Sequence, residues 1–108
     1  MKLKIALDTN VGKKRYEEFI GLGYDIVVVA EQAEKDCDWV ARAHKAGARF
    51  LISNDVDIPK LIERTGYPMF WVNYPNDNPQ FKEWLVEYCD QVIKFKLNVF
   101  KNVLKEAT

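Results

Sequence analysis

Four aspartates of this chain could together hold a divalent cation. Asp8 directly follows one apolar, strand-like stretch, Asp55 and Asp57 follow another, and Asp36 stands at the start of a predicted helix. Parallel strands of an α/β sheet end at one common edge, and the helices that follow them begin there, so these carboxylates are predicted to converge. Carboxylate oxygens favour Mg²⁺ or Mn²⁺ over zinc. Such an ion polarises phosphoryl oxygens and generates a hydroxide nucleophile.

Each aspartate also has a simpler interpretation. Asp36 and Asp57 could cap the helices that they precede, a contribution of about 1 kcal/mol each. Asp8 and Asp55 could be turn residues. Two carboxylates about 4 Å apart repel by roughly 4 kcal/mol at an effective dielectric constant near 20, and a divalent cation removes that cost. Four turn acids on one predicted edge therefore make a metal site as good an interpretation as four unrelated turns.

The alternation of strand-like and helix-like segments predicts the scaffold that positions these acids. The stretch "DIVVVA" at 25–30 is typical of a strand covered on both faces. We therefore expect an α/β fold with three layers, α/β/α, around a short parallel sheet. Residues 1–79 would form this domain, and residues 80–108 would form a helical extension. The expected strands cover 2–7, 25–30, 49–53 and 68–72, and the expected helices cover 13–22, 36–46 and 58–64.

The composition is that of an ordinary one-domain protein, and it does not identify a binding partner. The chain has 108 residues, enough for one domain, with 16 basic and 16 acidic side chains. The formal net charge of zero does not point to nucleic acid, although a local patch would suffice. No stretch approaches the roughly 20 apolar residues of a membrane span. Cys37 and Cys89 have no metal-like spacing and are interpreted as free thiols, so we expect a protein of the cytoplasm, a reducing compartment. Without a membrane span, we expect no membrane partner.

Two segments resemble the signatures of PIN-domain proteins. They are "IALDTNV" at 5–11 and "DCDWVARAHKAGARFLISNDVDI" at 36–58. The resemblance implies a Mg²⁺- or Mn²⁺-dependent ribonuclease of the kind often found as a toxin, with RNA as substrate and an antitoxin-like protein as partner. It further implies that three acids and a serine are catalytic, that Asp57 ligates or supports the metal, and that the serine orients a carboxylate or the attacking water. The catalytic set would be Asp8, Asp36, Asp55 and Ser53, and the metal ligands Asp8, Asp36, Asp55 and Asp57.

The chain departs from most PIN nucleases in one region. Only 27 residues separate Asp8 from Asp36, so the helical insert that carries a catalytic glutamate in that family is missing. The chain is similar instead to a shortened PIN-like subfamily, in which Glu31 is a candidate substitute and Glu34 a possible further ligand. A catalytically weak or inactive PIN-like binding or regulatory module is the alternative function. A receiver-type phosphoacceptor domain fits less well, because "MFWVNYP" lacks the required late-strand lysine.

Two further predictions concern phosphate contacts and the tail. Lys13, Lys14 and Arg15 follow the first strand and are the best candidates for phosphate contacts, although a solvated first helical turn is the simpler interpretation. Residues 80–108 could form one helix of about 43 Å. Its apolar residues make two stripes, with Leu85 and Tyr88 assigned to one and Trp84 and Ile93 to the other. We therefore expect a homodimer or partner surface built largely from residues 93–104, the alternative being a tail buried in its own domain.

Overall fold

A computed structural model of the chain describes residues 2–75 and 84–100, and the following statements concern those residues. Strands and helices alternate along the chain. The elements are β1 (Lys4–Leu7), α1 (Thr9–Gly21), β2 (Asp25–Val29), α2 (Asp36–Lys45), β3 (Phe50–Ser53), α3 (Asp57–Thr65), β4 (Phe70–Asn73) and α4 (Leu85–Val99).

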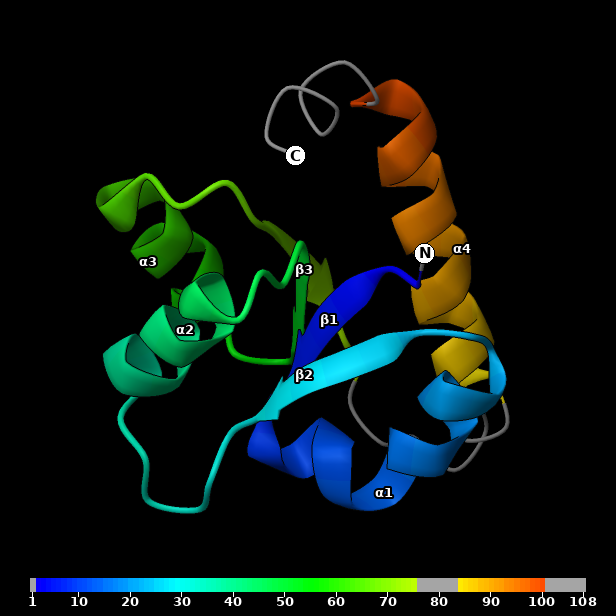
Figure 1. Cartoon of the computed structure of the whole chain (residues 1–108), viewed down its shortest axis with the longest axis horizontal. Coiled ribbons are helices and arrows are strands. Elements are labelled where there is room, and N and C mark those ends of the chain that lie inside the picture. The colour runs from blue at the N-terminus through cyan, green and yellow to red at the C-terminus, as the bar shows by residue number, and fades with distance from the viewer. Residues whose placement is uncertain (1, 76–83, 101–108) are drawn as a thin grey trace.

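The four strands form one parallel sheet in the order β2-β1-β3-β4. Helices α1 and α4 cover one face of the sheet, and α2 and α3 cover the other (Figure 1). The expected three-layer α/β/α fold around a parallel sheet is therefore confirmed. Because every pair of neighbouring strands is parallel, all four strands direct their carboxyl ends to one edge, which we call the carboxyl edge.

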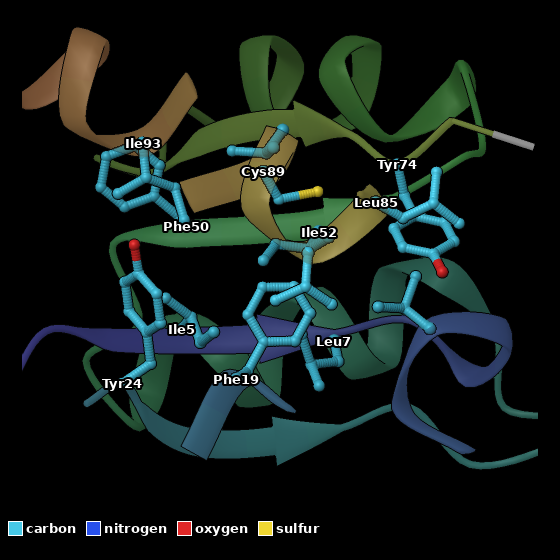
Figure 2. Packing of buried hydrophobic residues seen from close by; sticks show 13 residues of the cluster. Ile5, Leu7, Phe19, Tyr24, Phe50, Ile52, Tyr74, Leu85, Cys89 and Ile93 are labelled. Carbon is cyan, nitrogen blue, oxygen red and sulfur yellow. The ribbon is translucent and has the colours of Figure 1, made fainter. Parts of the chain in front are cut away.

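Alternation along the strands divides the core into two clusters. Ile5 and Leu7 of β1 point to the face covered by α1 and α4, whereas Ala6 points to the face covered by α2 and α3. Phe50 and Ile52 of β3 share the first face, and Figure 2 shows them above Ile5 and Leu7. Successive residues of a strand point to opposite faces, and helices cover both faces, so every residue of a short strand can be apolar.

Helix α1 begins at Thr9, four residues earlier than the sequence pattern indicated. Asp8 is its N-cap, and the Asp8 side chain accepts a hydrogen bond from the backbone N–H of Thr9 at 2.7 Å. The first turn then lies close to β2, since a Cβ on Gly12 would stand 2.5 Å from Cγ1 of Val29. The helix therefore starts directly at the carboxyl edge, with Asp8 fixed at the junction.

Helix α4 runs without a break and packs on the domain's own sheet. Leu85, Val86, Cys89 and Ile93 are buried in the cluster shared with β1 and β3. The expectation that Ile93 belongs to a partner surface is thus wrong, because its side chain is fully buried against the sheet. The remainder of the expected helix, residues 80–83 and 101–108, lies outside the described residues. Of the helices described, none is long and apolar enough to span a membrane.

Candidate acidic site

Pairing of β1 with β3 brings Asp8 and Ser53 together across 45 positions of sequence. Leu7 is the register partner of Ile52, so Asp8 and Ser53 both follow directly. The backbone N–H of Asp8 donates to the carbonyl of Ile52 at 3.0 Å. The Ser53 hydroxyl then donates to Oδ2 of Asp8 at 2.6 Å. Both oxygens of the Asp8 carboxylate are therefore held in a fixed direction, one by Thr9 and one by Ser53.

Ser53 links the two strands to the loop that follows β3. It is fully buried, and its Oγ accepts the backbone N–H of Asp55 at 3.0 Å while its own proton goes to Asp8. The Ser53 carbonyl accepts Nε1 of Trp71 at 3.0 Å and the backbone N–H of Tyr74 at 3.0 Å. A buried hydroxyl that both donates and accepts a hydrogen bond can orient its neighbours, and its burial then costs little folding free energy.

Asp55 lies in the loop between β3 and α3, and Asp57 follows where that loop enters the helix. Oδ1 of Asp55 accepts the backbone N–H of Asp57 at 2.9 Å, a turn contact typical of aspartate. Asp57 is exposed and is the first residue of α3, whose N-cap is Val56 and has no side-chain capping bond. The interpretation of Asp57 as the cap of α3 is therefore wrong. Asp57 lies beside the site without joining the contacts described for Asp8 and Ser53.

Asp36 reaches the same edge from the other side of the sheet. It is the first residue of α2, and the N-cap is Lys35, so Asp36 does not act as the cap that the sequence allowed. Its Oδ1 accepts Nε1 of Trp39 at 3.1 Å. Burial raises the pKa of the Asp36 carboxyl, and the neighbouring carboxylates of Asp55 and Asp8 raise it further, while the Trp39 indole opposes them.

Asp8, Asp36 and Asp55, together with Ser53, form what we call the acidic site. These carboxylates come from three different parts of the chain, and after burial the nearby Asp55 and Asp8 are what raise the pKa of Asp36. Nevertheless, among residues 2–75 and 84–100, no three acidic, histidine or cysteine side chains are arranged as a ready metal-binding group. The carboxylates are neighbours without the ligand geometry of a formed metal site.

No protein-family model, curated protein or solved structure matches this chain. The acidic site must therefore be interpreted from its own chemistry. Its polar side-chain atoms are all carboxylate or hydroxyl oxygens, a type of donor that Mg²⁺ and Mn²⁺ prefer in proteins. The pKa of Asp36 is raised mainly by burial, and the carboxylates of Asp55 and Asp8 add to that shift, so negative charge is disfavoured at this position.

The other acids suggested by the sequence lie apart from this group. Glu34 pairs with Arg42 through Oε1 at 2.7 Å and accepts the backbone N–H of Glu31 at 3.0 Å. The bond from Arg42 lowers the pKa of Glu34, so this glutamate serves an ion pair that ties the loop before α2 to α2 itself. Glu31 is exposed and does not enter the pKa balance of Asp36.

Of the basic residues after β1, Arg15 has contacts that define its position. Nε of Arg15 donates to the Tyr74 hydroxyl at 3.3 Å, and its guanidinium pairs with Glu18 at 3.2 Å. Arg15 thus has structural partners at this end of the sheet. Lys14 is exposed, and the side chain of Lys13 lies outside the described residues.

Two tryptophans support the acidic site, and sequence analysis missed both. Trp39 is almost fully buried and donates to Asp36, and Trp71 donates to the carbonyl of Ser53. A buried indole N–H needs a partner, so a tryptophan three residues after an aspartate at a helix start was a usable signal. The Trp71 contact crosses from β4 to β3 and could be found only once the strand order was known.

Replacing Ser53 by alanine is expected to destabilise the protein by about 1–2 kcal/mol. The change removes the hydroxyl that satisfies Asp8 and the backbone N–H of Asp55, and it leaves those groups partly buried without that partner. Urea unfolding of both proteins at pH 7 measures the difference. Thr65→Ala, which removes an exposed hydroxyl bonded locally to Ile62, is the control and should change stability by less than about 0.5 kcal/mol.

Proposed function

We propose that this protein is a Mg²⁺- or Mn²⁺-dependent ribonuclease of the shortened PIN-like type. One observation carries the proposal. Carboxylates from the end of β1, the start of α2 and the loop after β3 lie near one another: Ser53 bonds both to Asp8 and to the backbone of Asp55. Burial raises the pKa of Asp36, and the nearby carboxylates of Asp55 and Asp8 raise it further. Folding has assembled like charges that repel one another, and a divalent cation is the simplest chemical reason for keeping them together.

The proposed ligands follow from the donors present at the carboxyl edge. Asp8, Asp36 and Asp55 would hold the metal, with Asp57 adjacent as a support. When bound, the ion supplies Lewis-acid polarisation of a phosphodiester and lowers the pKa of a water molecule. The Ser53 hydroxyl holds the Asp8 carboxylate in one direction through its bond to Oδ2. The Trp39 indole fixes Asp36 in the same way.

A second candidate is a PIN-like binding or regulatory module without turnover. It is favoured by the absence, within the described parts of the chain, of three side chains arranged as a ready metal-binding group. It is also favoured by the engagement of Glu34 with Arg42, which leaves that glutamate committed to an ion pair. Under this proposal the acidic site persists as a structural feature and RNA is not cleaved.

A Mn²⁺ titration with three proteins tests the first proposal. We expect millimolar MnCl₂ to raise the melting temperature of the wild-type protein, and a 5′-labelled single-stranded RNA to be cut only when the metal is present. Asp36→Asn should abolish both effects, because it removes a ligand charge. Asp38→Asn is the matched control, since Asp38 is an exposed aspartate in the same helical turn, and it should behave as the wild type. Metal binding without cleavage would favour the second candidate. If MnCl₂ neither raises the melting temperature nor permits cleavage, the metal site is refuted.

Without metal, Asp36→Asn is expected to stabilise the protein at neutral pH by up to about 1 kcal/mol, the size of one partly exposed charge contact. The folded-state pKa of Asp36 is raised, so the folded state binds the proton more tightly than the unfolded state does. The wild type therefore loses stability as the pH rises above the unfolded value of about 3.9, and the asparagine variant does not. Urea unfolding at pH 3 and pH 7.5 checks this, since the gain should vanish at the lower pH.

A further inference from the structure

One side of α4 exposes a line of large apolar side chains, which we call the α4 stripe. Trp84 at the N-cap is 65% exposed, Tyr88 47%, Phe95 65% and Val99 52%. With Gln91 between them, these residues follow at intervals of four, three, four and four, which places them along one side of the helix. Helix α4 lies on the outside of the molecule, over the sheet face that it shares with α1 (Figure 1). Exposed apolar side chains gathered along one side of a helix, here interrupted only by Gln91, mark an interaction surface.

The two halves of the α4 stripe differ in shape. Its first half borders a mostly apolar hollow of about 440 Å³, lined by Asn73, Pro75, Trp84, Leu85 and Tyr88. Its second half carries Phe95 and Val99, which are exposed and do not line that hollow. One half of the surface is therefore concave and the other half projects.

Charges along one flank of the α4 stripe are also of opposite sign in the two halves. Glu87 lies beside the first half, and Lys94, seven residues later and on the same side, lies beside the second. Lys94 pairs with Asp90 at 2.9 Å and is 71% exposed, so its ammonium group keeps donors facing solvent. In an antiparallel helix pair related by a two-fold axis, the same flank of each helix meets its counterpart. Such a pair would bring Glu87 to the partner's Lys94.

We propose that the α4 stripe is the interface of a homodimer, in which two α4 helices pack antiparallel about a two-fold axis near Gln91. The concave half of each stripe then receives the projecting half of the other. Tyr88 lies opposite the partner's Phe95, Trp84 lies opposite the partner's Val99, and the charged flanks attract at both ends. Such self-complementarity is what an isologous interface requires, and it favours a second copy over an unrelated protein.

The length of the helix sets the expected strength of this interface. Helix α4 has 15 residues and is about 22 Å long, so two paired helices with the adjoining hollows form a small interface, and stable interfaces begin at about 1,200 Å² of buried surface. We expect a dissociation constant in the micromolar range. The proposal is independent of the nuclease activity, because the acidic site contributes no residue to the α4 stripe.

Sedimentation velocity of the full chain from 1 to 300 µM tests the association. The wild type should change from monomer to dimer across this range, and Phe95→Glu should stay monomeric because it places a charge in the paired apolar surface. Leu22→Glu is the control, since Leu22 is 48% exposed at the end of α1 and outside the α4 stripe, and it should dimerise as the wild type. A wild type that stays monomeric at 300 µM, or a Phe95→Glu protein that still dimerises, would overturn the proposal.

Cysteine crosslinking tests the antiparallel arrangement. In a Cys37→Ser background, which removes the exposed native thiol, Gln91→Cys should form an intermolecular disulfide on mild oxidation, because the two-fold axis brings position 91 of both copies together. Lys60→Cys, an exposed position on α3, should remain monomeric under the same conditions. Far-ultraviolet circular dichroism of each variant verifies the fold. A dimer in which position 91 crosslinks no faster than position 60 would contradict the proposed axis.

Discussion

Replacing Phe19 by alanine is expected to destabilise the protein by about 3–5 kcal/mol, the range for truncation of a fully buried aromatic side chain. Phe19 is completely buried and packs edge-on against Tyr24, with ring centroids 6.1 Å apart. Figure 2 shows its ring reaching from α1 toward Ile52 in the sheet. Since domains of this size are stable by about 5–15 kcal/mol, the variant should lose a large part of its folding free energy.

Ile20 provides the matched control for this experiment. It is the next residue of the same helix, is 37% exposed and does not belong to the buried cluster. Ile20→Ala should cost about 1–2 kcal/mol, less than Phe19→Ala, because a smaller and partly solvated apolar side chain is removed. Urea unfolding of the three proteins at pH 7 measures both differences. Equal losses at positions 19 and 20 would mean that α1 is rotated from the orientation described.

Tyr24→Phe is expected to cost about 1.5–3 kcal/mol, the range for a hydrogen bond to a charged group. The Tyr24 hydroxyl donates to the carboxylate of Asp90, which also pairs with Lys94. This bond joins the loop before β2 to α4, so its loss weakens attachment of that helix to the sheet. Tyr16→Phe, which alters an exposed tyrosine of α1, is the control and should have almost no effect.

Alkaline pH should reduce the difference between wild type and Tyr24→Phe. Burial and the neighbouring Asp90 raise the pKa of Tyr24, so its hydroxyl ionises in the unfolded state first, near pH 10. The contribution of Tyr24 is thus complete below pH 10 and is lost as the pH rises further. Burial also raises the pKa of Cys89 to about 12, but that thiol is present in both proteins and cancels. Unfolding curves at pH 8 and pH 11 should show the difference shrinking.

The sequence contained enough information to predict the sheet and the position of the acids along it. The expected strands ended at Leu7 and Ser53, with Asp8 directly after the first and Asp55 two residues after the second, which predicted both acids at strand ends. Adjacency of β1 and β3 then brought Asp8 and Ser53 into contact. What remained hidden was the start of α1, because Asp8 serves as a helix cap and a site residue at once, and only the local backbone decides that.

The orientation of α4 could not be predicted from its pattern. Apolar residues surround this helix, so Leu85, Tyr88, Ile93 and Phe95 are equally plausible core residues by type. The sheet decides between them, since the cluster around Phe50 and Ile52 accepts Leu85, Cys89 and Ile93. Tyr24 adds a polar contact with Asp90 that fixes the same rotation. Such long-range selection leaves no local trace in the sequence.

The central place of β1 has a consequence for the order in which the molecule can be made. A ribosome adds about 5–20 residues per second, so several seconds separate synthesis of Asp8 from that of Ser53, its partner 45 positions later. During that interval β1 can pair only with β2, and Asp8 has no hydroxyl to hold it. The Asp8–Ser53 contact of the acidic site therefore arises late, when β3 pairs with the free edge of β1. Exchange of the Asp8 amide hydrogen, which bonds to Ile52, would report that event directly.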